Sequence, residues 1–158
     1  MGIIGEVTFS PDHADGVCIL VVEDDDADAF LIEGALRRIA GVKAVARASN
    51  GLEAIQQIAS GRIKPELALI DLHMPLKDGC NLMAELVARF QPSFPMVVLT
   101  SAPMGVNARR NGLHLASRVI TKPDSMVELE TVLADIIHSA RRGAFPPIEC
   151  EAPVASGI

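Results

Sequence analysis

The sequence predicts an α/β domain with three layers, in which a doubly wound sheet of five parallel strands lies between helices. Two observations predict this class. Short uninterrupted apolar runs alternate with longer segments whose apolar residues recur every three or four positions, patterns typical of fully buried strands and of amphipathic helices. Five such strand–helix units follow one another, and right-handed crossovers between parallel strands then place helices on both faces of the sheet.

Each expected strand is a short apolar run bounded by polar or turn-forming residues. The five strands are expected at 17–22, 42–48, 67–70, 96–100 and 117–121. The first run, VCILVV, is long enough for a strand and too short for a helix. It ends abruptly at four consecutive acidic residues, which marks a change from buried to solvated chain.

The expected helices are recognised by one apolar stripe each and by the residues at their ends. After the first strand, apolar residues recur every four positions from Leu31, and Gly41 stops that helix. Asn50 suits the N-cap of a helix over 51–60, and a third helix is expected near 80–90.

The last third of the chain is less regular before its final helix. Proline and glycine residues within 103–113 predict a weak or irregular helix there. Pro123 and Asp124 open the last helix, whose apolar stripe is strong. The globular domain is therefore expected at 17–141. An N-terminal extension, 1–16, precedes it, and a Pro- and Ala-rich tail, 142–158, follows; disorder is favoured for both, although IIGEVTFS could add an edge strand.

Length and composition restrict the class of protein. A chain of 158 residues fits one domain, and its 49% apolar content without Trp or Tyr requires an aliphatic core. A net charge of −6 argues against a protein that coats nucleic acid. Three cysteines without a CxxC pair disfavour a disulfide framework or a zinc site. No signal peptide or membrane span is recognised, so a cytoplasmic protein is expected.

Polar residues follow four of the expected strands at the point where each strand ends. Glu23 and Asp24 follow the first strand, Asp71 ends the third, Thr100 ends the fourth and Lys122 lies just past the fifth. In open parallel sheets, ligands bind beyond the carboxyl ends of the strands. These five side chains are therefore expected to meet at one edge of the sheet.

Three carboxylates crowded together need a cation to neutralise them. Oxygen ligands in a partly open site suit Mg²⁺, and the nearby ammonium and hydroxyl groups suit phosphoryl transfer to an accessible carboxylate. Each acid alone has a simpler interpretation as a helix N-cap, and Asp25 or Asp26 is assigned to that role. The coincidence of all five residues at one edge favours the functional interpretation.

Four segments, in order along the chain, resemble the bacterial two-component response-regulator receiver domain: ILVVEDD, LIDLHMPLKDG, VVLTSA and ITKP. The resemblance covers roughly residues 17–140. It implies the flavodoxin-like strand order 2-1-3-4-5, with Asp71 as the phosphoacceptor. It also implies a Mg²⁺ site formed by Glu23, Asp24, Asp71 and the backbone carbonyl of His73. The side chain of His73 is interpreted as solvated rather than as a group acting on the phosphoryl.

The resemblance further implies that Thr100 supplies a switch hydroxyl and that Lys122 holds a phosphoryl oxygen. It implies a cis peptide bond between Lys122 and Pro123. One position departs from the family pattern, because Val119 stands where an aromatic residue usually couples phosphorylation to the surface. The surface that transmits the signal is thus expected to work differently from that of the typical family member.

The resemblance implies a stand-alone response regulator that accepts a phosphoryl group from a sensor histidine kinase or a histidine phosphotransfer protein. Such a protein signals through contacts with a downstream protein target and is not a turnover enzyme beyond its own phosphorylation and slow dephosphorylation. Direct DNA binding is not expected, and the oligomeric state stays open. The alternative is a receiver-like adaptor that works without phosphate. A nucleotide enzyme is disfavoured, because neither GxGxxG nor GxxxxGK[ST] occurs.

Overall fold

The computed structural model describes residues 8–9, 15–74, 77–101 and 112–145. The elements in chain order are β1 (Thr8–Phe9), β2 (Val17–Val22), α1 (Asp26–Arg37), β3 (Val42–Ala48), α2 (Gly51–Ala59), β4 (Leu67–Asp71), α3 (Gly79–Phe90), β5 (Met96–Thr100), the 3₁₀ helix η1 (Leu113–Leu115), β6 (Arg118–Thr121) and α5 (Met126–Arg141). Strands and helices alternate over most of this length, as the apolar pattern predicts.

The sheet has the order β1-β3-β2-β4-β5-β6. Its last five strands are parallel, and they follow the order 2-1-3-4-5 when counted from β2, so the predicted fold is confirmed. The sixth strand is the difference from the prediction. Thr8 and Phe9 of β1 pair antiparallel with Val45 and Ala44 of β3, which matches the edge-strand alternative for IIGEVTFS and not the favoured disorder. This pairing satisfies backbone groups at an edge that would otherwise be open.

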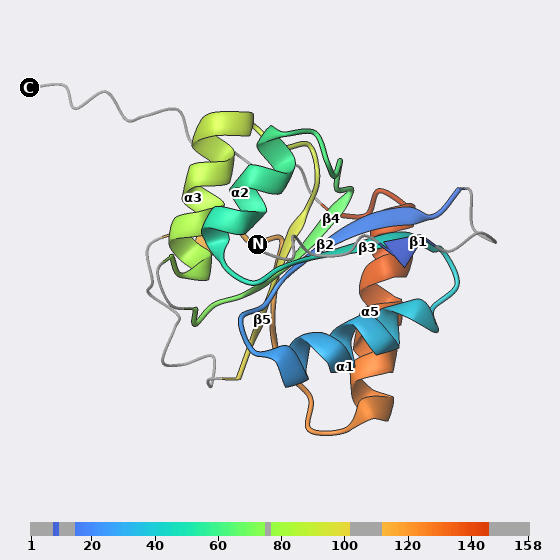
Figure 1. The fold of residues 1–158 in the computed structure, drawn as a ribbon. Coiled ribbons are helices and arrows are strands. Elements are labelled where there is room, and N and C mark those ends of the chain that lie inside the picture. The colour runs from blue at the N-terminus through green and yellow to red at the C-terminus, as the bar shows by residue number, and fades with distance from the viewer. Residues whose placement is uncertain (1–7, 10–14, 75–76, 102–111, 146–158) are drawn as a thin grey trace, which may run out of the picture.

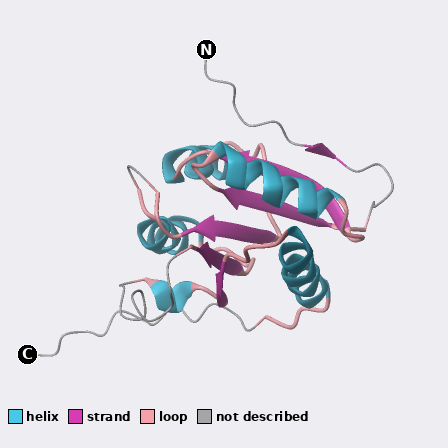
Figure 2. Cartoon of the chain, turned by 90° about the horizontal axis from the view of Figure 1, so that it is seen from below, coloured by secondary structure: helices cyan, strands magenta, loops and turns pink. Residues whose placement is uncertain are grey.

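Helices cover both faces of the sheet (Figures 1 and 2). Helices α1 and α5 lie on one face, and α2 and α3 lie on the other. Side chains of β4 alternate between two apolar clusters, with Leu67 and Leu69 on the α1/α5 side and Ala68 and Ile70 on the α2/α3 side. Because both faces of this central strand are buried, its sequence is a continuous apolar run rather than an alternating one.

Side-chain caps determine where the helices begin. The Asp25 carboxylate accepts a hydrogen bond from the backbone N–H of Asp28 at 2.8 Å, which makes Asp25 the N-cap of α1. Asn50 is the N-cap of α2, as predicted. The last helix starts later than expected, because Ser125 caps it and Met126 is its first residue.

Parts of the irregular region before β6 are described. Residues 102–111 lie outside the described part of the chain, so most of the stretch 103–113 is not assigned. The partly buried side chains of Leu115 and Val119 pack against the α2/α3 apolar cluster. Among the described residues, no peptide bond is cis, and the expected cis bond before Pro123 is therefore wrong. No described helix is long and apolar enough to cross a membrane.

Gly79 fixes the approach of α3 to the end of β4. A Cβ atom at this position would lie 2.5 Å from the Asp71 carbonyl oxygen and 3.0 Å from the Leu72 Cα. We expect Gly79→Ala to lower the free energy of unfolding by about 1–3 kcal/mol, because backbone would have to move. Gly34→Ala is the matched control: nothing lies within 4 Å of a Cβ there, and a helical alanine should stabilise by about 0.5–1 kcal/mol.

Urea denaturation of both glycine variants measures these changes. Opposite signs for Gly79→Ala and Gly34→Ala are the expected result. A Gly79→Ala protein as stable as the wild type would show that the backbone at the end of β4 is not held by this contact.

Candidate functional site

The strand register brings the predicted polar residues to one edge of the sheet. Val22 of β2 is aligned with Ile70 of β4, so the residues that follow them, Glu23 and Asp71, are neighbours. Asp71 is aligned with Leu99 of β5, and Thr100 follows Leu99. This places an acid, a second acid and a hydroxyl group side by side at the carboxyl ends of three central strands.

The fifth predicted residue, Lys122, is placed at the same edge by its position after β6. Thr100 of β5 is aligned with Thr121 of β6, and Lys122 comes directly after Thr121. The backbone N–H of Lys122 donates a 2.7 Å hydrogen bond to the carbonyl oxygen of Thr100, which continues the pairing one step further. The Lys122 side chain therefore starts from a fixed point beside the acids.

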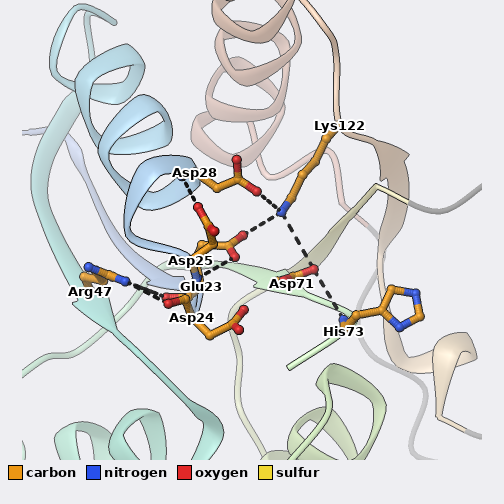
Figure 3. Close-up of polar contacts among 8 residues, drawn as sticks. All are labelled: Glu23, Asp24, Asp25, Asp28, Arg47, Asp71, His73 and Lys122. Carbon is orange, nitrogen blue, oxygen red and sulfur yellow. Dashed lines mark hydrogen bonds and ion pairs between the residues drawn. The ribbon is translucent and has the colours of Figure 1, made fainter. Parts of the chain in front are cut away.

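Three carboxylates form a compact group at this edge (Figure 3). One oxygen from each of Glu23, Asp24 and Asp71 lies within 4.8 Å of the others. Glu23 and Asp71 are buried, with 1% and 7% of their surface exposed, whereas Asp24 is exposed. The group is thus open to solvent on the Asp24 side and enclosed by protein on the other.

The ammonium group of Lys122 contacts three carboxylates. Its Nζ lies 2.7 Å from Glu23 Oε2 and 2.9 Å from Asp28 Oδ2. The distance to Asp71 Oδ1 is longer, 3.8 Å. Lys122 is therefore hydrogen-bonded to Glu23 and Asp28, and it stands next to Asp71 without a hydrogen bond to it.

Burial changes the acidity of the groups in this cluster. It raises the pKa of Glu23 to about 7, against the pull of Lys122. It also raises the pKa of Asp71, which the positive charge of Lys122 opposes. Burial disfavours the charged form of Lys122, but hydrogen bonds to Glu23 and Asp28 outweigh it and raise the pKa of the ammonium. The buried carboxylates thus carry an unfavourable desolvation that a bound cation would relieve.

Arg47 holds the acidic loop between β2 and α1. Its guanidinium Nη2 donates to the carbonyl oxygen of Glu23 at 3.1 Å and contacts the carboxylate of Asp26 at 2.8 Å. A second donor, Nε, lies 3.3 Å from the same carbonyl oxygen. The two hydrogen bonds to the Glu23 carbonyl oxygen hold the backbone from which the Glu23 and Asp24 carboxylates extend (Figure 3), whereas the Asp26 carboxylate lies outside them on the exposed surface of α1.

Two further residues were predicted for the site: His73 lies at the rim of the cluster, and Thr100 lies in the core. The backbone N–H of His73 donates to Asp71 Oδ1 at 3.3 Å. The imidazole of His73 is exposed and points away from Glu23 and Asp24 (Figure 3). Thr100 is fully buried at the end of β5.

Asp28 and Arg47 were missed from the sequence. Asp28 belongs to the first turn of α1, where acids are common because they favour the helix N-terminus. Arg47 is the next-to-last residue of β3, a strand that also contains Lys43, so a single basic residue there does not point to the site. The four-residue spacing between Asp24 and Asp28 gives no helical signal, because Asp24 lies before the N-cap of α1.

The cluster is suited to chemistry at a carboxylate oxygen. Glu23, Asp24 and Asp71 offer oxygen ligands of the kind that bind a hard divalent cation. Lys122 adds a fixed positive charge 3.8 Å from Asp71 Oδ1, which is beyond hydrogen-bond distance. A cation and an ammonium group on either side of one carboxylate can stabilise the equatorial oxygens of a transferring phosphoryl group.

The chain is similar to known proteins over most of its length. Residues 19–134 match the family model described as the response regulator receiver domain. A protein-glutamate methylesterase/protein-glutamine glutaminase from Archaeoglobus fulgidus is 30% identical over 129 residues. The alignment covers 80% of the present chain but only 36% of that relative. The activity named for the relative therefore belongs to a protein much longer than the matched part.

Solved structures show the same fold over nearly their whole length. The phosphorylated cyanobacterial phytochrome response regulator RcpA superposes with a TM-score of 0.70 at 25% identity, covering 85% of this chain and 99% of RcpA. The Mn²⁺-bound form of the response regulator Rcp1 has a TM-score of 0.64 at 26% identity, covering 86% of this chain and 99% of Rcp1.

Proposed function

Because the chain belongs to the response regulator receiver domain family, we propose that it is a phosphorylation switch that accepts a phosphoryl group on Asp71. The observation that carries this proposal is the Lys122 ammonium held 3.8 Å from Asp71 Oδ1 beside three clustered carboxylates. The family comprises the receiver domains of two-component signalling. The donor would be a histidine kinase or a histidine phosphotransfer protein, and the output would be an altered protein–protein contact.

In the proposed transfer, an oxygen of the Asp71 carboxylate attacks phosphorus. A new O–P bond forms while the N–P bond of a donor phosphohistidine breaks, and the electron pair leaves with the imidazole, which takes a proton from solvent. Lys122 would contact one phosphoryl oxygen, and the Thr100 hydroxyl would donate to another. Two fixed donors on one group hold the phosphorylated state in a single geometry.

The residues of the cluster fit Mg²⁺. The donor set is oxygen-only, one carboxylate is exposed and two are buried, which leaves room for water and a phosphoryl oxygen as further ligands. Glu23, Asp24, Asp71 and the backbone carbonyl of His73 would hold the ion. When bound, Mg²⁺ would neutralise the negative charge that develops on the phosphoryl group. The metal in the Mn²⁺-bound structure of Rcp1 supports this proposal.

Reaction with acetyl phosphate tests the proposal without a partner protein. With Mg²⁺, the wild-type chain should gain one phosphoryl group, measured by intact mass, and peptide mapping should place it on Asp71. Asp71→Asn should gain no phosphoryl group. Wild type in EDTA should react at least about 100-fold more slowly, because no cation then neutralises the charge on the phosphoryl oxygens. An unmodified wild-type protein with a normal unfolding transition would reject the proposal.

Val119 favours a second candidate, an adaptor that signals without phosphate. Its small side chain packs against the α2/α3 cluster and cannot swing as an aromatic ring would. The intact set of acids, hydroxyl and lysine argues against this candidate. The acetyl phosphate experiment separates the two, because an adaptor has no need to react.

A further inference from the structure

Among the described residues, the Lys122 ammonium donates hydrogen bonds to two carboxylates, and one of these lies outside the candidate metal cluster. Glu23 belongs to the cluster, whereas Asp28 extends from the first turn of α1 and reaches Lys122 Nζ at 2.9 Å, on the side away from Asp71 in the view of Figure 3. The side chain of Asp28 is 43% exposed, while that of Lys122 is only 15% exposed. Asp28 therefore contacts the buried end of the lysine from the rim of the site.

A divalent cation would change the balance between these partners. A Glu23 carboxylate that shares its charge with a metal attracts the ammonium less strongly. Asp28 is not part of the group that meets the metal-ligand geometry among the described residues. Its attraction for Lys122 would therefore persist when Glu23 is engaged.

The position of Lys122 suits a phosphoryl oxygen better than it suits Asp71 itself. The gap of 3.8 Å between Nζ and Asp71 Oδ1 exceeds a hydrogen bond. A phosphoryl group on Asp71 would project an oxygen further out, towards the ammonium. If Lys122 instead closed onto Asp71, it would engage the carboxylate that has to attack phosphorus.

We infer that Asp28 is a positioning residue that holds Lys122 away from the Asp71 carboxylate and in reach of an incoming phosphoryl oxygen. Asp28 itself contacts neither the phosphoryl group nor the metal. Its effect on phosphoryl acceptance passes through Lys122 alone. This inference rests on the proposed function, since it assigns Lys122 to the phosphoryl group.

The rate of phosphorylation by acetyl phosphate at saturating Mg²⁺ tests the inference. Asp28→Asn should react about three- to tenfold more slowly than wild type, the effect of weakening one charge-assisted contact at a partly exposed site. Asp28→Glu, which retains the charge, should recover most of the rate. In a Lys122→Met background, Asp28→Asn should have no further effect. A wild-type rate in Asp28→Asn, or the same loss without Lys122, would overturn the inference.

Asp26→Asn is the matched control. Asp26 lies in the same turn of α1, but its 92% exposed side chain contacts Arg47 instead of Lys122. Removing its negative charge should leave the rate unchanged or raise it slightly, because the donor is an anion. An equal slowing in both variants would assign the effect to charge or helix stability and overturn the role of Asp28.

A measurement without any phosphoryl donor keeps the inference separate from the proposed function. In ¹⁵N NMR of lysine ammonium groups, a hydrogen-bonded Lys122 Nζ should give a protected signal that is absent from Lys122→Arg. The signal should shift or broaden in Asp28→Asn and persist in Asp26→Asn. If acetyl phosphate does not phosphorylate the wild type, the proposed function is wrong. If the wild type is phosphorylated but Asp28→Asn leaves the Lys122 Nζ signal unchanged, only the inference about Asp28 is wrong.

Discussion

Replacing Lys122 with methionine should lower the free energy of unfolding by about 3–5 kcal/mol at neutral pH without divalent cations. The reason is that Glu23 and Asp71 are buried and Lys122 is the cation hydrogen-bonded or adjacent to both. Without it, two desolvated carboxylates would face each other. Urea denaturation in EDTA measures the loss.

Mg²⁺ addition and a control variant test the stability change expected for Lys122→Met. Addition of Mg²⁺ should recover much of the stability of Lys122→Met, because the ion neutralises the same carboxylates. Arg118→Met, at the opposite end of β6, is the matched control. Its ion pair with Asp135 is exposed on both sides, 44% and 58%, so its loss should cost less than about 1 kcal/mol. Equal losses in the two variants would contradict a buried charge cluster.

The second large effect concerns pH. The pKa of Glu23 is raised by burial to about 7 from an ordinary 4.5. Between these values the folded protein binds a proton that the unfolded chain releases, so the free energy of unfolding falls as pH rises. The full difference corresponds to about 3 kcal/mol, and the raised pKa already includes the opposing effect of Lys122. The stabilisation is complete below about pH 4.5 and is lost as pH passes about 7.

Comparison with Glu23→Gln isolates this contribution. In EDTA, the stability of wild type relative to Glu23→Gln should decline by about 2–3 kcal/mol between pH 4.5 and 8. With saturating Mg²⁺ the decline should disappear or reverse, because the ion favours the ionised carboxylate. Parallel pH profiles of the two proteins in EDTA would show that Glu23 ionises at its ordinary pKa. A decline unaffected by Mg²⁺ would show that Glu23 does not meet the cation.

Some features follow from local sequence because they depend only on neighbouring residues. The continuous apolar run of β4 and the polar residues directly after each strand identify a parallel sheet with Glu23, Asp24 and Asp71 at one edge. Asn50 identifies the start of α2, because a capping side chain needs only the next turn of backbone. The sequence by itself therefore determined the fold class and the candidate cluster.

Other features required the tertiary structure, because they join segments far apart in the chain. The pairing of Thr8 and Phe9 with β3 depends on which edge of the sheet is left open. The contact between Lys122 and Asp28 crosses 94 residues, and no local pattern distinguishes Asp28 from an ordinary acid in a first helical turn. Packing of α1 against the sheet decided that this acid, and not Asp26, faces the lysine, since only the folded register sets which side of the helix meets the site.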